Sequence, residues 1–166
     1  MDPLTADLKK LLVRELLAFR REIEMFPDDA LLWQTVPGVT NSVGNLALHV
    51  CGNLKHFVGH TLGKMPYVRN REVEFGQKSG SRSELVNEIQ ATVTVVDAAL
   101  PLVSEDVLDR DYPEQVGGVT INTRMFLLHL AVHLAHHLGQ AGYLRRALTG
   151  ENTTSGPLPI KPLARN

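Results

Sequence analysis

Apolar residues recur every three or four positions in four separate stretches of the chain, and this spacing places them on one face of an α-helix. The stretches predict four long helices, which cover approximately residues 4–26, 43–62, 82–103 and 123–148. Pro27 follows the first stretch and Gly150 the last, as is common after the end of a helix. No stretch predicts a strand, although the β-branched segments VTVV and GGVTIN are the weak points of that statement.

Polar residues that can cap a helix N-terminus precede three of these stretches. Ser81 and Glu84 have the spacing of a capping box, in which each side chain accepts a hydrogen bond from the other's backbone amide. The remaining candidates are Thr40, Asn41 or Ser42 for the second helix and Asn122 or Thr123 for the fourth. The predicted helices therefore have plausible starting points as well as apolar faces.

Four amphipathic helices of about twenty residues bury their apolar faces most simply as a bundle. We therefore predict an all-α four-helix bundle, one domain over residues 1–166 with its core at about 4–148. Residues 63–81 have no sustained period and predict a long loop after the second helix, a feature that is usually functional or mobile. The proline-punctuated residues 150–166 predict an irregular tail.

The overall composition adds little charge to this picture. The 166 residues include 17 basic and 18 acidic side chains, which gives a formal net charge of −1, and 43 % of the residues are apolar. A chain of this length can form one domain with a real core. Because counterion release needs clustered positive charge, we expect neither a nucleic acid nor a membrane surface as a partner.

The cysteine content and the N-terminal segment favour a cytoplasmic protein. Cys51 has no partner for a disulfide within the chain, and the segment MDPLTADLKK lacks the apolar region of a secretion signal. Residues 125–144 have the length of a membrane span and no charged side chain, but four histidines, Gln140 and two glycines make insertion costly. We expect this segment to be the central helix of a soluble core.

The fourth predicted helix carries four histidines within residues 129–140, HLAVHLAHHLGQ. His133 and His137 share a face with apolar residues, so we expect them on the buried side, at a spacing where two imidazoles can bind one metal ion. His129 and His136 project to one side, where a groove or an interface is expected. Two neutral core histidines that bond to backbone or water are the alternative for the buried pair.

A third ligand can come from the second predicted helix. Polar side chains occupy one side of it, with His49 at the middle, and they are Ser42, Asn45, His49, Asn53, His56 and His60. In a bundle, His49 could face His133 and His137. A solvent-exposed helix face has the same pattern, so that interpretation stays open, and His56 and His60 are expected at the surface or the rim.

Other catalytic motifs receive little support. The segment HLAHH lacks the glutamate of the HExxH zinc proteases, and no nucleophile elbow, phosphate-binding loop or dinucleotide-binding motif occurs. Cys51 points away from His49 around the helix, which favours a buried thiol over a ligand or nucleophile. The segment RNREVEF could bring charge to a substrate or form a solvated turn; its charged residues are Arg69, Arg71, Glu72 and Glu74.

The segments NSVGNLALHVCGNL and HLAHHLGQAGYLRR together resemble the DinB-like, or YfiT-like, superfamily of bacterial metal-binding four-helix proteins. The resemblance covers most of residues 4–148. It implies that His49 and the pair His133 and His137, which precedes Gly-Gln, bind one divalent ion per chain, whether zinc, nickel, iron or manganese. The sequence departs from the family at Leu138, where an arginine is common, and this puts in doubt any contact such an arginine makes.

Three neutral nitrogens leave a coordination position open, which is the arrangement of catalytic sites. Relatives that this chain resembles include thiol S-transferases that use low-molecular-weight thiols, so the resemblance implies a metal-dependent transferase or hydrolase with a small-molecule substrate. The expected supporting or substrate-contacting residues are Asn45, Asn53, Arg69, Arg71, His136 and Gln140. The loop over residues 64–80 is expected to help admit the substrate.

A non-catalytic module of the stress-response type, which binds a metal or another ligand as a dimer, is the second hypothesis. Leu128 and Val132 are apolar on the side of the fourth helix that faces away from its core stripe, which favours a homodimer interface.

Overall fold

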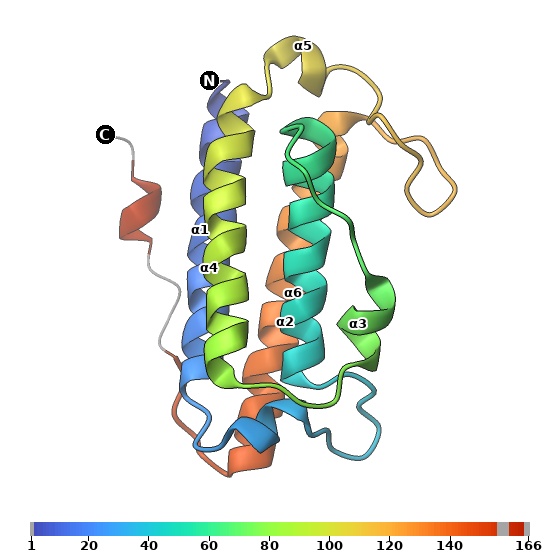
Figure 1. The fold of residues 1–166 in the computed structure, drawn as a ribbon. Coiled ribbons are helices and arrows are strands. Elements are labelled where there is room, and N and C mark those ends of the chain that lie inside the picture. Colours follow the sequence, from blue (N-terminus) through green and yellow to red (C-terminus); the bar gives the residue numbers. More distant parts are fainter. Residues whose placement is uncertain (1, 156–159, 165–166) are drawn as a thin grey trace.

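The computed structural model describes residues 2–155 and 160–164. Its four long helices form an all-α bundle, which confirms the predicted fold class (Figure 1). They are α1 (Pro3–Glu24), α2 (Val43–Leu54) with its continuation η2 (Lys55–Leu62), α4 (Arg82–Ala99) and α6 (Thr123–Thr149). The shorter elements are η1 (Asp29–Trp33), α3 (Arg71–Gly76), η3 (Leu100–Leu102), α5 (Glu105–Leu108) and η4 (Lys161–Leu163). No helix within the described ranges is long and apolar enough to cross a membrane.

The ends of the long helices lie close to their predicted positions because the expected caps form. Ser81 and Glu84 make the capping box of α4, with Glu84 accepting from the Ser81 amide at 2.7 Å. Among the candidates for the second helix, Ser42 caps α2, and Asn122 caps α6. Gly150 ends α6 in the left-handed conformation, with φ of 69°, which glycine adopts without strain.

The order of helix directions explains the long segment between α2 and α4. Figure 1 shows that α2 and α4 run the same way, whereas α1 and α6 run the opposite way. The chain therefore has to return along the whole length of α2 and η2 before α4 can begin. A twenty-residue helix is about 30 Å long, so the return needs at least about nine extended residues. Residues 63–81 make this return.

The return segment is more ordered than the sequence predicts, because it contains the helix α3. Asn70 caps this helix by accepting from the Val73 amide at 3.1 Å. Asn45 of α2 donates to the backbone oxygens of Glu74 and Gln77, at 3.0 and 2.9 Å. The prediction of a segment without regular structure was wrong here, since six residues are too few to display a helical period.

The second predicted helix ends at Leu62 as expected, but its last eight residues form a π-helix, η2. Thr61 donates its hydroxyl to the backbone oxygen of His56, five residues earlier, at 3.2 Å. Two glycines bring η2 close to α4, since a Cβ at Gly59 would collide with Val95 and one at Gly63 would lie 2.7 Å from the Ala99 Cβ. π-Helical segments are rare and are frequent at functional sites, and this one directly follows the α2 turn that carries Asn53.

The buried face of α6 is rotated slightly from the predicted one. Its buried side chains include Leu127, Leu130, Leu134, Leu138, Ala141 and Arg145. His133 and His137 lie at the edge of this face and are half-buried, so the expectation that they sit on the buried stripe was wrong in degree. The buried face is centred on the row Leu134, Leu138, Ala141 and Arg145, and the predicted face did not include Arg145.

Arg145 is buried because it pairs with a carboxylate on another helix. Its Nε lies 2.6 Å from Oε2 of Glu22 on α1, and its Nη2 donates to the backbone oxygen of Thr153 at 2.7 Å. Burial alone would raise the pKa of Glu22, but hydrogen bonds from Arg145 and Ser155 and the Arg145 charge outweigh it, so this pKa is lowered. The pair joins α1, α6 and the start of the tail. Residues 156–159 and 165–166 of the predicted tail lie outside the described residues.

Candidate metal centre

Three histidines from two helices converge on one point. His49 comes from the middle of α2, and His133 and His137 come from successive turns of α6, which packs beside α2 (Figure 1). The Nε2 atom of His133 lies 3.3 Å from Nε2 of His49 and 3.1 Å from Nε2 of His137. One ligand atom from each residue can be chosen so that all three lie within 4.8 Å of one another.

These distances fit the donor set of a metal ion. Two nitrogens bound to one tetrahedral ion at about 2.0–2.1 Å are separated by about 3.3 Å. The two measured Nε2 distances of 3.3 and 3.1 Å are close to that value. All three ligand atoms lie within 4.8 Å of one another, so the three histidines can hold a divalent cation once their rings adjust.

In two of the three rings, the nitrogen that faces away from the centre forms a hydrogen bond. The lone pair of the other ring nitrogen then points at the centre. Nδ1 of His49 donates to Oε2 of Glu74 at 2.9 Å, and Nδ1 of His137 donates to Oε1 of Gln140 at 2.7 Å. Each neutral imidazole then presents an unprotonated Nε2. If Nε2 of His133 carries a proton, it can donate a hydrogen bond to Nε2 of His49 or to Nε2 of His137, but not to both. A cation at the centre would satisfy all three nitrogens at once.

The electrostatic environment keeps the α6 pair unprotonated. Burial lowers the pKa of His133 to about 4, and the nearby His137 and His49 rings add to the effect. Burial also lowers the pKa of His137. Because a metal ion binds the neutral imidazole, both side chains are ready to act as ligands near neutral pH.

Acid should weaken the metal-free fold through His133. Its pKa falls from 6.5 in the unfolded chain to about 4 in the folded one. The unfolded chain therefore takes up the proton first, and the stabilisation that is fully present above pH 6.5 is lost progressively as the pH falls towards 4. Urea denaturation of chelator-treated protein at several pH values measures this loss. His133→Asn should flatten the curve above pH 5, and an unchanged curve in that variant would show that another group is responsible.

Glu74 of α3 positions the His49 ring. It is 4 % exposed and forms a two-pronged ion pair with Arg69, with Nε–Oε1 and Nη2–Oε2 distances of 2.7 and 2.8 Å. Burial would raise the pKa of Glu74, but Arg69 and His49 outweigh this and lower it, so the side chain is a carboxylate. Phe75 packs on the same imidazole with ring centroids 4.8 Å apart. The short helix α3 thus fixes both the tautomer and the plane of His49.

The role of Glu74 was not found by sequence reasoning. Its position in a loop-like segment gives no period that would place it beside α2, and the nearest signal is the capping Asn70 four residues earlier. Gly52 makes the contact possible, because a Cβ there would overlap the Glu74 carboxylate. Arg69 was expected to support the ligands or to touch substrate; its Nη2 lies 3.3 Å from Nδ1 of His49, and its guanidinium also pairs with Glu74. Arg71 is exposed and lies over the Phe75 ring at 5.6 Å.

The polar side of α2 is buried along the whole helix, and α3 packs against α2. The alternative interpretation, a solvent-exposed face, was therefore wrong for α2. The buried members are Ser42, Asn45, His49 and Asn53. Asn45 holds the return segment through hydrogen bonds to the backbone of Glu74 and Gln77. Among the described residues, no hydrogen bond joins Asn45 to the three converging histidines. The Oδ1 atom of Asn53 is buried without a hydrogen-bond partner among the described residues.

The other four histidines lie outside the converging group, and two of them contact it. His136 and His129 are exposed, with ring centroids 5.3 Å from His137 and 5.8 Å from His133. His56 is half-buried beside Glu114, at 3.2 Å, and the exposed His60 contacts the Met65 backbone oxygen. The positions of His56 and His60 match the expected surface or rim.

Cys51 and Leu138 both face the protein interior. Cys51 is fully buried, and burial raises the pKa of its thiol to about 12, so it is neither an accessible nucleophile nor a ready ligand. Leu138, which replaces the arginine common in the resembling family, is 9 % exposed and packs in the core. Support for the histidines therefore comes from Glu74, Arg69 and Gln140.

Glu74→Gln should weaken metal binding by about 10–100-fold, because the His49 ring loses its charged acceptor and Arg69 loses its partner. Calorimetric titration of the metal-free protein with zinc measures the change. Glu72→Gln is the matched control, since Glu72 is an exposed acid of the same short helix. Equal affinity of the Glu74 variant and this control would contradict the positioning role.

The comparisons with known proteins agree with the helical architecture. The family model of the DinB superfamily matches residues 11–141 of the chain, and this range includes all three converging histidines and Glu74. No curated protein matches the chain significantly.

Proposed function

The chain belongs to the DinB superfamily, and on this basis we propose that it is a metal-dependent enzyme in which His49, His133 and His137 hold one divalent ion. The observation that supports this most is the convergence of three Nε2 atoms whose rings are held from behind by Glu74 and Gln140. Imidazole ligands suit zinc, nickel and iron, and manganese is a further candidate, so the donor set leaves the ion open.

The described residues supply three nitrogen ligands and no fourth protein ligand at this centre. A divalent ion in such a site supplies Lewis acidity, since it lowers the pKa of a water or thiol beside it and thereby yields a nucleophile near neutral pH. The chain's own contribution is to keep the ligand nitrogens unprotonated, to orient the rings, and to cover one side of the centre with α3.

We propose thiol transfer or hydrolysis as the reaction. In thiol transfer, the sulfur of a low-molecular-weight thiol forms a bond to an electrophilic carbon, the leaving group departs with the electrons of the broken bond, and the thiol proton passes to solvent. In hydrolysis, water takes the place of the thiol. His136 is exposed and its ring lies 5.3 Å from that of His137, so we propose it as the general acid or base of the reaction.

Turnover assays with purified protein test the proposal. A panel of small thiols is combined with alkyl and aryl electrophiles, and the products are identified by mass so that thiol transfer and hydrolysis are separated. We expect turnover to disappear with a chelator and to return when one equivalent of metal is added. Full activity in metal-free protein would contradict an enzyme of this kind.

A non-catalytic dimeric module is the second candidate, and one observation favours it. Exposed apolar side chains follow the outer side of α6, namely Met125, Leu128, Val132 and Tyr143. Light scattering measures the oligomeric state, and Val132→Asp should produce monomers if this side joins two copies. A metal-loaded dimer without turnover in the panel would favour the module over the enzyme.

A further inference from the structure

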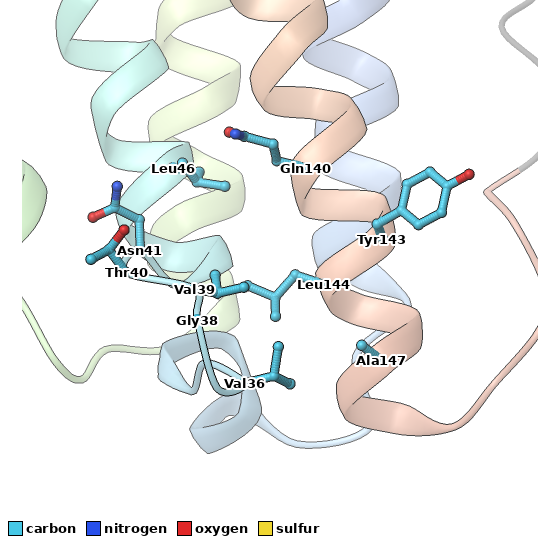
Figure 2. Close-up of a pocket in the computed structure, with 10 residues that line it drawn as sticks. All are labelled: Val36, Gly38, Val39, Thr40, Asn41, Leu46, Gln140, Tyr143, Leu144 and Ala147. Atoms are coloured by element: carbon cyan, nitrogen blue, oxygen red, sulfur yellow. The ribbon is translucent and has the colours of Figure 1, made fainter.

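A second feature adjoins the metal centre: a cavity of about 460 Å³ between the α1–α2 connection and the C-terminal half of α6. Figure 2 shows its walls, with residues 36–41 on one side and α6 on the other. Cavities of this volume are of the size that holds small organic ligands. None of the residues that line it is charged.

The lining divides into an apolar part and a polar part. The apolar wall is formed by Val36, Val39, Leu46, Leu144 and Ala147. The polar side chains are Thr40, Asn41, Gln140 and Tyr143, and in Figure 2 Gln140 lies at the opposite edge from Val36 and Ala147. A charged ligand would lose its hydration here without gaining an opposite charge, whereas an uncharged ligand with an apolar body and one polar end matches the walls.

Gln140 connects this cavity to the metal centre. Its Oε1 accepts the hydrogen bond from Nδ1 of His137, so one end of its amide is already engaged by a metal-centre residue. Within the described part of the chain, its Nε2 donates no hydrogen bond, and the side chain is exposed. The free N–H groups of Gln140 can therefore donate to a carbonyl oxygen of a ligand in the cavity.

We propose that this cavity binds an uncharged carbonyl compound with an aromatic or short aliphatic body, with the body against Leu144 and Ala147 and the carbonyl at Nε2 of Gln140. The proposal goes beyond the proposed function, because Gln140 contacts the Nδ1 side of His137, which faces away from the converging Nε2 atoms, so the carbonyl end would not lie at the ion. The cavity itself does not depend on a bound metal.

Binding of the fluorescent ketone prodan, a neutral naphthalene with a propionyl group, tests the proposal. We expect saturable binding to the full chain with a blue-shifted emission. Ala147→Phe fills the cavity from an exposed position on α6 and should weaken binding by at least about tenfold. Ala135→Phe is the matched control, since Ala135 is also an exposed alanine of α6 and does not line the cavity. Val39→Glu, which adds a charge to the apolar wall, should weaken binding as well.

The anionic probe anilinonaphthalene sulfonate should bind at least about tenfold more weakly than prodan. His133→Ala should retain prodan binding. The metal content of the same samples is measured separately, so that the cavity and the metal centre are tested independently. Equal prodan affinity in the Ala147 and Ala135 variants, or stronger binding of the anionic probe, would overturn the proposal and leave the metal centre unaffected.

Discussion

His133→Ala is expected to reduce bound metal from about one ion per chain to almost none and to abolish any metal-dependent turnover. His133 occupies the central position of the cluster, because its Nε2 is within 3.3 Å of both other Nε2 atoms. Without it, two ligands remain, one from each helix, and the affinity of a two-nitrogen site is far below that of a three-nitrogen site. Elemental analysis of protein purified without a histidine tag or chelator measures the loss.

The matched control for this substitution is His129→Ala. His129 lies one turn earlier on α6, is exposed, and is not part of the converging group. It should leave metal content unchanged, so a general effect of removing a histidine from this helix would be detected. Retention of a full equivalent of metal by His133→Ala would show that the ion binds elsewhere.

Arg145→Ala should lower the free energy of unfolding by about 3–5 kcal/mol, because it leaves the carboxylate of Glu22 buried without its partner. Arg145 is fully buried, and its guanidinium also holds the Thr153 backbone oxygen at the start of the tail. A loss of this size is a large part of the total stability of a domain, which is about 5–15 kcal/mol. Urea denaturation of the metal-free protein measures the change.

Two further variants identify the cause of that loss. Arg146→Ala changes the neighbouring arginine, which lies over the Tyr143 ring, and should cost less than about 1 kcal/mol because the side chain is only half-buried. The double variant Glu22→Leu with Arg145→Met should be more stable than Arg145→Ala, since no charge is then left unpaired. Equal effects at Arg145 and Arg146 would contradict the importance of the buried pair.

The helices and the three converging histidines were accessible to sequence reasoning because both follow from local periodicity. The spacing of His133 and His137 places two rings on one helix face, and the polar side of α2 offers His49 as a third. The capping box at Ser81 fixed the start of α4 in the same local way. Local patterns of this kind survive folding because caps and apolar faces act within one helix.

Features that depend on contacts between distant segments were not accessible. Arg145 continues the row of Leu138 and Ala141 at helical spacing, but an arginine in such a row is buried only if it has a partner, and that partner, Glu22, lies on another helix. Glu74 is one of several charged residues in a segment without a period, and only its packing on α2 brings it to His49. The parallel course of α2 and α4, which forces the return segment over α2, is a property of the whole topology.

X-ray absorption at the zinc edge tests the central claim most directly, using full-length protein loaded with one equivalent of zinc. The convergence of His49, His133 and His137 predicts three imidazole nitrogens at about 2.0–2.1 Å from a single ion, with the multiple-scattering signature of histidine rings. A spectrum that shows an oxygen-only environment, or one with fewer than two imidazoles, would contradict it.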